Sequence, residues 1–150
     1  MKEDSENFLV RLSNVTGDAS LGKNFQTVVT IRDNEPPGIV AWGSTKGPVE
    51  ELVKRAEARG QKVSAFVPQL IFPFPKQEFE EFLSNIGQLL VVEQNYTAQF
   101  YKYMRSFVDL PADRTHVYKM SGGRMLTAAE IEVEVAKLLE PAASLAGVLA

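Results

Sequence analysis

Two short polar segments follow apolar runs and carry residue types suited to binding chemistry. The first segment consists of Gly43, Ser44, Thr45, Lys46 and Gly47. A glycine-flanked turn with two hydroxyls and a lysine suits a phosphate, a nucleotide or a carboxylate, above all where it opens a helix. The same residues also fit a helix N-cap and a tight turn with Lys46 in solvent. Both interpretations follow from the pattern.

The second segment is Glu93, Gln94 and Asn95, at the end of the apolar run 88–92. A carboxylate beside two amides can orient a ligand or a neighbouring domain. Alternatively, Asn95 caps a helix that begins at Tyr96, and Glu93 pairs locally. The pattern favours the capping interpretation.

The usual reagents of catalysis are scarce in the sequence. It contains no cysteine, which excludes thiolate nucleophiles and thiolate-held clusters within the chain. Its single histidine, His116, falls in a predicted strand, where a lone histidine more often has a structural role. We therefore predict no catalytic residue in this chain.

Charge and hydropathy exclude further classes. A net charge of −3 argues against a general nucleic-acid binder. Residues 1–6 are acidic and precede no apolar run, so no secretory signal is expected. No stretch reaches the ~18 apolar residues of a membrane helix. These features favour a cytoplasmic protein that does not enter a membrane.

The binding segments must be positioned by the elements around them, and the pattern of these elements changes at residues 34–38. Before that point, apolar residues such as Phe8, Val10, Val29 and Ile31 recur at every second position. This predicts an antiparallel β-hairpin with a long connection. Because an isolated hairpin is marginal in water, we expect its apolar face to mediate homo-oligomerisation.

After Gly38, strand and helix patterns alternate. The predicted strands are 39–42, 62–67, 88–92 and 115–119, and the predicted helices are 48–59, 76–84, 96–107 and 127–139. The alternation predicts an α/β fold with an open, mostly parallel sheet and helices on both faces. Right-handed crossovers would place the turns after Trp42, Val67, Val92 and Lys119 at one edge. The expected organisation is a hairpin at 1–36, an α/β domain at 37–141 and an Ala-rich tail at 142–150.

Aromatic residues gather in the middle of the chain: Phe72, Phe74, Phe79, Phe82 and those of Tyr96–Phe107. They can line a ligand groove, cover the sheet or form a subunit interface. Because Tyr101, Tyr103 and Phe107 cannot all lie on one side of a helix, we expect exposed aromatic surface or a partner that covers it.

Residues 39–140 resemble the C-terminal domain of the α subunit of 2-oxoacid:ferredoxin oxidoreductases. The resemblance rests on Val40-Ala-Trp-Gly-Ser-Thr-Lys-Gly47, Gln69-Leu-Ile-Phe-Pro-Phe-Pro75, Val91-Val-Glu-Gln-Asn-Tyr96 and Met125-Leu-Thr-Ala-Ala-Glu-Ile131. It implies a fold similar to the C-terminal domain of transketolase, and a role in contacts with other domains or subunits of the oxidoreductase. It also implies that thiamine diphosphate, magnesium and iron–sulfur clusters belong to other parts of the parent enzyme, which oxidises 2-oxoglutarate or pyruvate.

Residues 3–38 resemble the last two strands of a Calx-β domain. The matching pieces are Glu3-Asp-Ser-Glu-Asn-Phe8, Val10-Arg-Leu-Ser-Asn14 and Val28-Val-Thr-Ile-Arg-Asp-Asn-Glu35. The resemblance implies calcium binding by Glu3, Asp33 and Glu35, as in an adhesion fragment. Two unlike segments joined near Pro36 indicate a chimera.

Overall fold

The computed structural model describes residues 6–11, 26–31 and 35–139, and in the first two ranges it describes the pairing of the backbone only. The chain divides into two units, Met1–Asn34 and Glu35–Ala150. In the first unit, β1 (Glu6–Arg11) pairs antiparallel with β2 (Gln26–Ile31), and Phe8 lies opposite Val29. The antiparallel pairing predicted from the alternating pattern is confirmed.

Four parallel strands form the sheet of the second unit, in the order β4-β3-β5-β6. They are β3 (Gly38–Ala41), β4 (Ser64–Phe66), β5 (Leu89–Glu93) and β6 (Thr115–Lys119). The predicted α/β fold with a parallel sheet is therefore confirmed. Since all four strands run the same way, their carboxyl ends lie at one edge, which we call the carboxyl edge.

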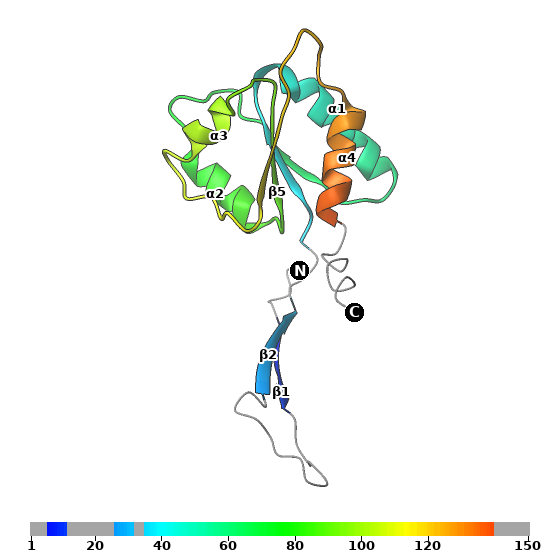
Figure 1. Ribbon diagram of the computed structural model, residues 1–150, viewed down its shortest axis with the longest axis vertical. Helices are drawn as coiled ribbons and strands as arrows, with labels where there is room; N and C mark the ends of the chain where they lie inside the picture. Colours follow the sequence, from blue (N-terminus) through cyan, green and yellow to red (C-terminus); the bar gives the residue numbers. More distant parts are fainter. Residues whose placement is uncertain (1–5, 12–25, 32–34, 140–150) are drawn as a thin grey trace, which may run out of the picture. The chain divides into compact units, whose positions relative to one another are not determined.

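Helices cover both faces of this sheet (Figure 1). Helices α1 (Lys46–Ala58) and α4 (Ala128–Leu139) lie on one face, and α2 (Lys76–Ser84) and α3 (Gln99–Met104) lie on the other. A short 3₁₀ turn, η1 (Gly43–Thr45), leads from β3 directly into α1. No described helix has the length and apolarity needed to span a bilayer.

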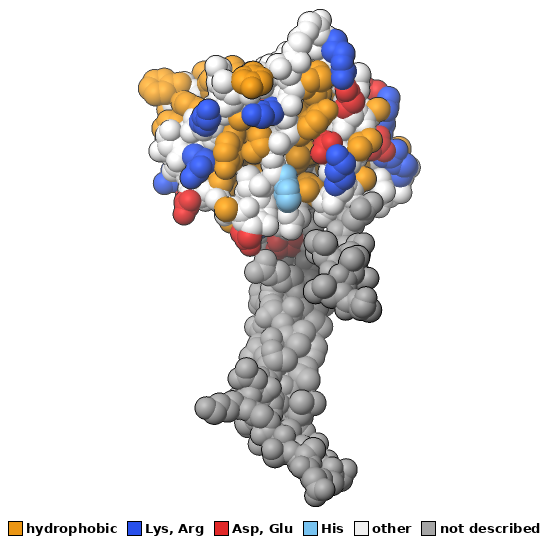
Figure 2. All heavy atoms as spheres, viewed as in Figure 1, with side chains coloured by type: hydrophobic (Ala, Val, Ile, Leu, Met, Phe, Trp, Pro, Cys, Tyr) orange, Lys and Arg blue, Asp and Glu red, His pale blue; other side chains and the backbone are white. Residues whose placement is uncertain are grey.

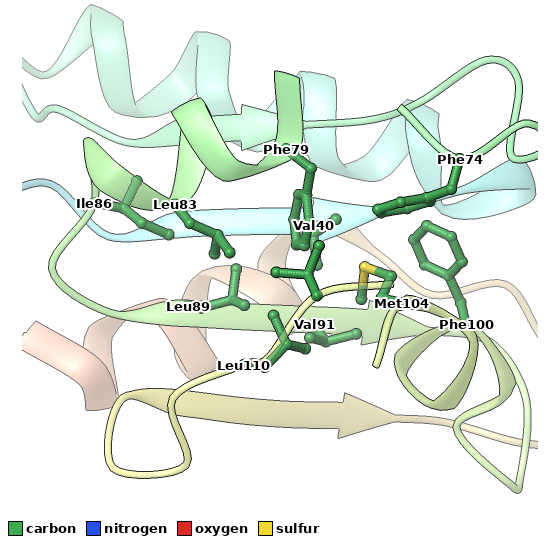
Figure 3. Packing of buried hydrophobic residues seen from close by; sticks show 11 residues of the cluster. Val40, Phe74, Phe79, Leu83, Ile86, Leu89, Val91, Phe100, Met104 and Leu110 are labelled. Atoms are coloured by element: carbon green, nitrogen blue, oxygen red, sulfur yellow. The ribbon is translucent and has the colours of Figure 1, made fainter. Parts of the chain in front are cut away.

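The core forms two layers because successive strand residues point to opposite faces. Every residue of β3 and β5 is buried, as expected for central parallel strands. Ile39 and Val92 pack with Leu52 and Ile131 on the α1 and α4 face. Val40 and Val91 pack on the opposite face, where Figure 3 shows Phe79 against Val40 and Phe74 opposite Phe100.

The element boundaries agree with the prediction at α2 and β6 and differ most at α3. A helix was predicted over 96–107, but α3 covers only Gln99–Met104. Its start is delayed because Ala98 has a left-handed backbone (φ 51°) and the preceding residues form a turn. Strand β4 is shorter than the predicted 62–67, since it pairs with β3 through only three residues. The predicted tail, 142–150, lies outside the described residues.

Candidate functional site

The parallel topology brings the two polar segments to the carboxyl edge, as expected. Residues 43–47 follow β3 and residues 93–95 end or follow β5, and these strands are neighbours in the sheet. Loops after β4 and β6 complete the same edge. In open parallel sheets this edge is where binding groups commonly lie, so it is the candidate functional site.

Two polar side chains of the Gly43–Gly47 segment are paired with residues just outside it. The buried Thr45 hydroxyl donates to the Trp42 carbonyl at 2.8 Å and accepts the Trp42 N–H at 3.3 Å. Lys46 Nζ lies 3.6 Å from the Glu50 carboxylate, one helical turn ahead. Gly43 has φ 60°, a left-handed conformation that glycine adopts without strain. Ser44 is exposed, and its hydroxyl forms no hydrogen bond with the described residues. Anion binding by this loop stays a prediction.

Glu93 is completely buried, and its carboxylate caps helix α3. It accepts the Phe100 N–H at 2.8 Å, the Tyr101 N–H at 2.7 Å and a hydrogen bond from the Asn95 amide. The first N–H groups of a helix have no partner within the helix, and a negative charge near them is favourable. The Glu93 carboxylate, a candidate ligand-binding group, therefore accepts hydrogen bonds from three donors within the chain.

Asn95 completes the cap. Its Oδ1 accepts the N–H groups of Thr97 at 3.1 Å and Gln99 at 3.2 Å. Asn95 and Glu93 together satisfy the first three N–H groups of α3. The predicted capping role of Asn95 is present, but the helix begins three residues later than expected and Glu93 supplies most of the cap. A ligand or interdomain role for Glu93 and Asn95 stays a prediction.

Gln94 joins the loops that follow β5 and β6. Its amide nitrogen donates to the Arg124 carbonyl at 2.8 Å and lies 3.8 Å from the Met125 sulfur. Its Oε1 accepts the Leu126 N–H at 3.5 Å. Sequence reasoning grouped Gln94 with its neighbours but did not foresee this contact. No local signal reveals it, because the two segments are about 30 residues apart.

Arg124 anchors the same loop to α4. Its guanidinium donates two hydrogen bonds to the Glu130 carboxylate. Glu130 also accepts the N–H and the hydroxyl of Thr127, and Thr127 Oγ1 accepts the Glu130 N–H. This is the capping box that Thr127 and Glu130 predict. Hydrogen bonds from Arg124 and then from Thr127 lower the pKa of Glu130 to about 2, and those to Glu130 raise the pKa of Arg124.

The other candidate residues, His116 and the predicted calcium ligands, lie away from the carboxyl edge or outside the residues that the structure describes. His116 is near the start of β6, where its Nε2 lies 3.1 Å from Gln88 Oε1. Of the predicted calcium ligands, Glu3 and Asp33 lie outside the described residues, and only Glu35 is placed. The described part of the chain contains no group of three His, Cys, Asp or Glu residues that could hold a metal ion. The calcium prediction and the chimeric origin stay predictions.

Known proteins are similar to this chain over more than half of its length. Residues 37–131 match the family model described as pyruvate:ferredoxin oxidoreductase core domain II. The chain is 29% identical over 102 residues to 2-oxoacid:ferredoxin oxidoreductase 2, subunit alpha, of Aeropyrum pernix, covering 68% of this chain. It also resembles a 2-oxoglutarate:ferredoxin oxidoreductase from Magnetococcus marinus, solved with 2-oxoglutarate, coenzyme A and succinyl-CoA bound.

The structural match is substantial but covers a small part of the larger chain. The TM-score is 0.65 with 25% sequence identity, and the match covers 90% of the present chain. The chain spans 16% of the length of the Aeropyrum subunit and 20% of the Magnetococcus chain. The matched segment is therefore one portion of a much longer polypeptide in both relatives.

Proposed function

The chain belongs to the pyruvate:ferredoxin oxidoreductase core domain II family, and from this premise we propose that it is a non-catalytic accessory domain of a thiamine-dependent 2-oxoacid:ferredoxin oxidoreductase. Its place is in the α subunit, where it packs against other domains or subunits. The substrate of the parent enzyme is a 2-oxoacid of the 2-oxoglutarate or pyruvate type. Support comes from both relatives, whose names describe ferredoxin-linked oxidation of 2-oxoacids.

The observation that carries this proposal is that three of the chemically capable groups at the carboxyl edge already have partners within the chain. The Glu93 carboxylate caps α3, the Thr45 hydroxyl is bonded to Trp42, and Lys46 faces Glu50. His116 contacts an amide rather than an acid or a nucleophile. Such an edge provides a rigid surface rather than a set of reagents.

The cofactors of the parent enzyme belong, in this proposal, to its other parts. The chain has no cysteine, so iron–sulfur clusters held by thiolates require ligands from elsewhere. The resemblance to the α-subunit domain implies that thiamine diphosphate and magnesium are likewise held by other parts of the enzyme. This domain would support the enzyme by positioning those parts.

An addition experiment tests the proposal. The Magnetococcus enzyme would be prepared without its segment similar to this chain, and the full 150-residue chain would be added back. We expect the chain to bind this deleted enzyme saturably, as measured by biolayer interferometry. The intact Magnetococcus enzyme is the matched control and should not bind the chain, because its own segment occupies the position. Equal binding to both, or to neither, would contradict the proposal.

A second measurement tests the non-catalytic part. The chain alone would be incubated with 2-oxoglutarate or pyruvate, coenzyme A, thiamine diphosphate, magnesium and a viologen dye. We expect no dye reduction above the rate without protein. Reduction that depends on both the 2-oxoacid and the thiamine cofactor would show that the chain carries catalytic groups.

A further inference from the structure

Large apolar side chains gather at the carboxyl edge and remain uncovered by the described part of the chain. We call Trp42, Leu70, Phe72, Tyr96 and Met125 the carboxyl-edge rim. Their exposed fractions are 37%, 63%, 76%, 76% and 56%. Each of the four loops that follow β3, β4, β5 and β6 contributes to the rim. Exposed apolar residues that occur singly need no explanation, but a set drawn from four loops at one edge indicates an interaction surface.

The loop after β4 is held so that Phe72 points outward. The Tyr103 hydroxyl donates to the Ile71 carbonyl. Phe74 is buried and stacks on Phe107 with ring centroids 5.1 Å apart. Because residues on both sides of Phe72 are anchored, its exposure is part of the folded structure. The contact surface is therefore largely formed before any partner binds, which lowers the entropic cost of binding.

The other rim residues are also held by neighbours. The Trp42 ring lies 5.7 Å from the Phe100 ring. The Lys119 ammonium lies over the Tyr96 ring, 5.5 Å from its centroid. Met125 is held beside Gln94, which bonds the Arg124 carbonyl. The rim is thus held in place by α3 and by contacts between its own loops.

The charged side chains on the loops of the rim are all cationic. The segments 42–47, 67–75, 94–98 and 119–127 contain Lys46, Lys119 and Arg124 but no aspartate or glutamate, although the whole chain has net charge −3. Lys46 and Arg124 pair with acids on the helices, whereas Lys119 forms no ion pair among the described residues. In Figure 2, hydrophobic side chains lie along the upper left edge and across the centre, and acidic side chains lie at the lower edge and on the right, where lysines and arginines accompany them.

Building on the function proposed above, we propose that the carboxyl-edge rim is the surface through which this domain docks. Its partner is an apolar surface bordered by carboxylates, on another domain or subunit of the parent oxidoreductase. Aromatic residues and methionine are enriched at interface centres, and Lys119 would face the acidic border. A second copy of the chain is a poor occupant, because it would bring its own cations against Lys119.

The experiment uses the deleted Magnetococcus enzyme as the binding probe. Phe72→Ser and Tyr96→Ser remove exposed rim residues, and each should raise the Kd about tenfold or more, as expected for aromatic anchors of an interface. Lys119→Glu should raise the Kd and make binding less sensitive to salt. Val133→Ser is the matched apolar control, because Val133 is 56% exposed on α4. Lys54→Glu on α1 is the matched charge control, and both controls should stay within about twofold of wild type.

The outcomes separate the two proposals. If the wild-type chain does not bind, the accessory function fails and the docking surface fails with it. If the wild type binds but Phe72→Ser and Tyr96→Ser bind equally well, only the docking surface is wrong. Sedimentation that shows a dimer, dispersed by Phe72→Ser, would identify a second copy as the occupant and overturn the proposed partner. Circular dichroism and thermal melting of every variant would exclude misfolding as the cause of lost binding.

Discussion

The Glu93 carboxylate accepts the backbone N–H of Tyr101 at 2.7 Å, so the last residue of β5 holds the first turn of α3. The same carboxylate accepts the Phe100 N–H. Helix α3 in turn supports the Trp42 ring through Phe100 and the loop after β4 through Tyr103. One buried carboxylate therefore organises three of the four loops at the carboxyl edge.

Replacing Glu93 tests this relationship. Glu93→Gln would remove the charge and direct an amide NH₂ towards N–H donors, leaving a buried donor without a partner. We expect the free energy of unfolding to fall by about 1–3 kcal/mol. Urea denaturation would measure this change. Glu57→Gln, on the exposed side of α1, is the control and should change stability by less than about 0.5 kcal/mol. Equal stability of both variants would mean that the carboxylate does not cap α3.

The linkage between Arg124 and Glu130 predicts a pH dependence. The pKa of Glu130 is lowered to about 2 in the folded chain, below the roughly 4.3 of an unfolded glutamate. Its contribution to stability is therefore fully present above pH ~4.5 and is lost as pH falls towards ~2. Arg124→Gln should move the pKa of Glu130 upward, towards its ordinary value.

Side-chain carbon NMR across pH 2–6 would record this titration. Arg105→Gln is the control, because Arg105 lies over the Tyr101 ring on the opposite face of the sheet and should leave Glu130 unaffected. If Glu130 titrates at the same pH with and without Arg124, the guanidinium is not the main cause of the shift.

Two glycines should respond oppositely to the same substitution. A Cβ at Gly38 would lie 2.5 Å from Ile86 Cδ1 and 2.8 Å from Phe82 Cζ, inside the core. Gly38→Ala should therefore cost about 1–3 kcal/mol of stability through overpacking. A Cβ at Gly47, in the first turn of α1, meets no atom within 4 Å. Gly47→Ala should be neutral or stabilise by up to about 1 kcal/mol. Thermal melting of the two variants, side by side, would show whether the signs differ.

Replacing Phe79 and replacing Phe72 should change the free energy of unfolding by very different amounts. Phe79 is completely buried and touches Phe66, Phe74 and Phe82. Phe79→Ala should destabilise the fold by about 3–5 kcal/mol. Phe72→Ala should change stability by less than about 0.5 kcal/mol, because Phe72 is exposed. Chemical denaturation distinguishes these values easily. A large loss from Phe72→Ala would mean that its ring supports the fold and is not available for docking.

Local signals in the sequence were enough to predict the elements and their class. The apolar run at 89–92 reads as a strand buried on both faces, and β5 is buried throughout. Thr127 and Glu130 predict a capped helix start, and their hydrogen bonds form it. The prolines between residues 68 and 75 exclude a regular element there, and none is present. These features depend on dihedral preferences and on spacing within a few residues, so they can be predicted from the sequence.

Only the tertiary structure decided which residues are buried in the core and which stay exposed for contact with a partner. The sequence does not distinguish Phe72 from Phe74, yet Phe74 is buried against Phe107 and Phe72 is exposed. Nor does it show that Glu93 meets N–H groups seven and eight residues ahead, which delays the start of α3. The physical reason is that burial and long-range hydrogen bonds depend on which segments become neighbours after the sheet assembles. Residue type and spacing brought the polar segments to one edge, and packing then made that edge a surface for contact.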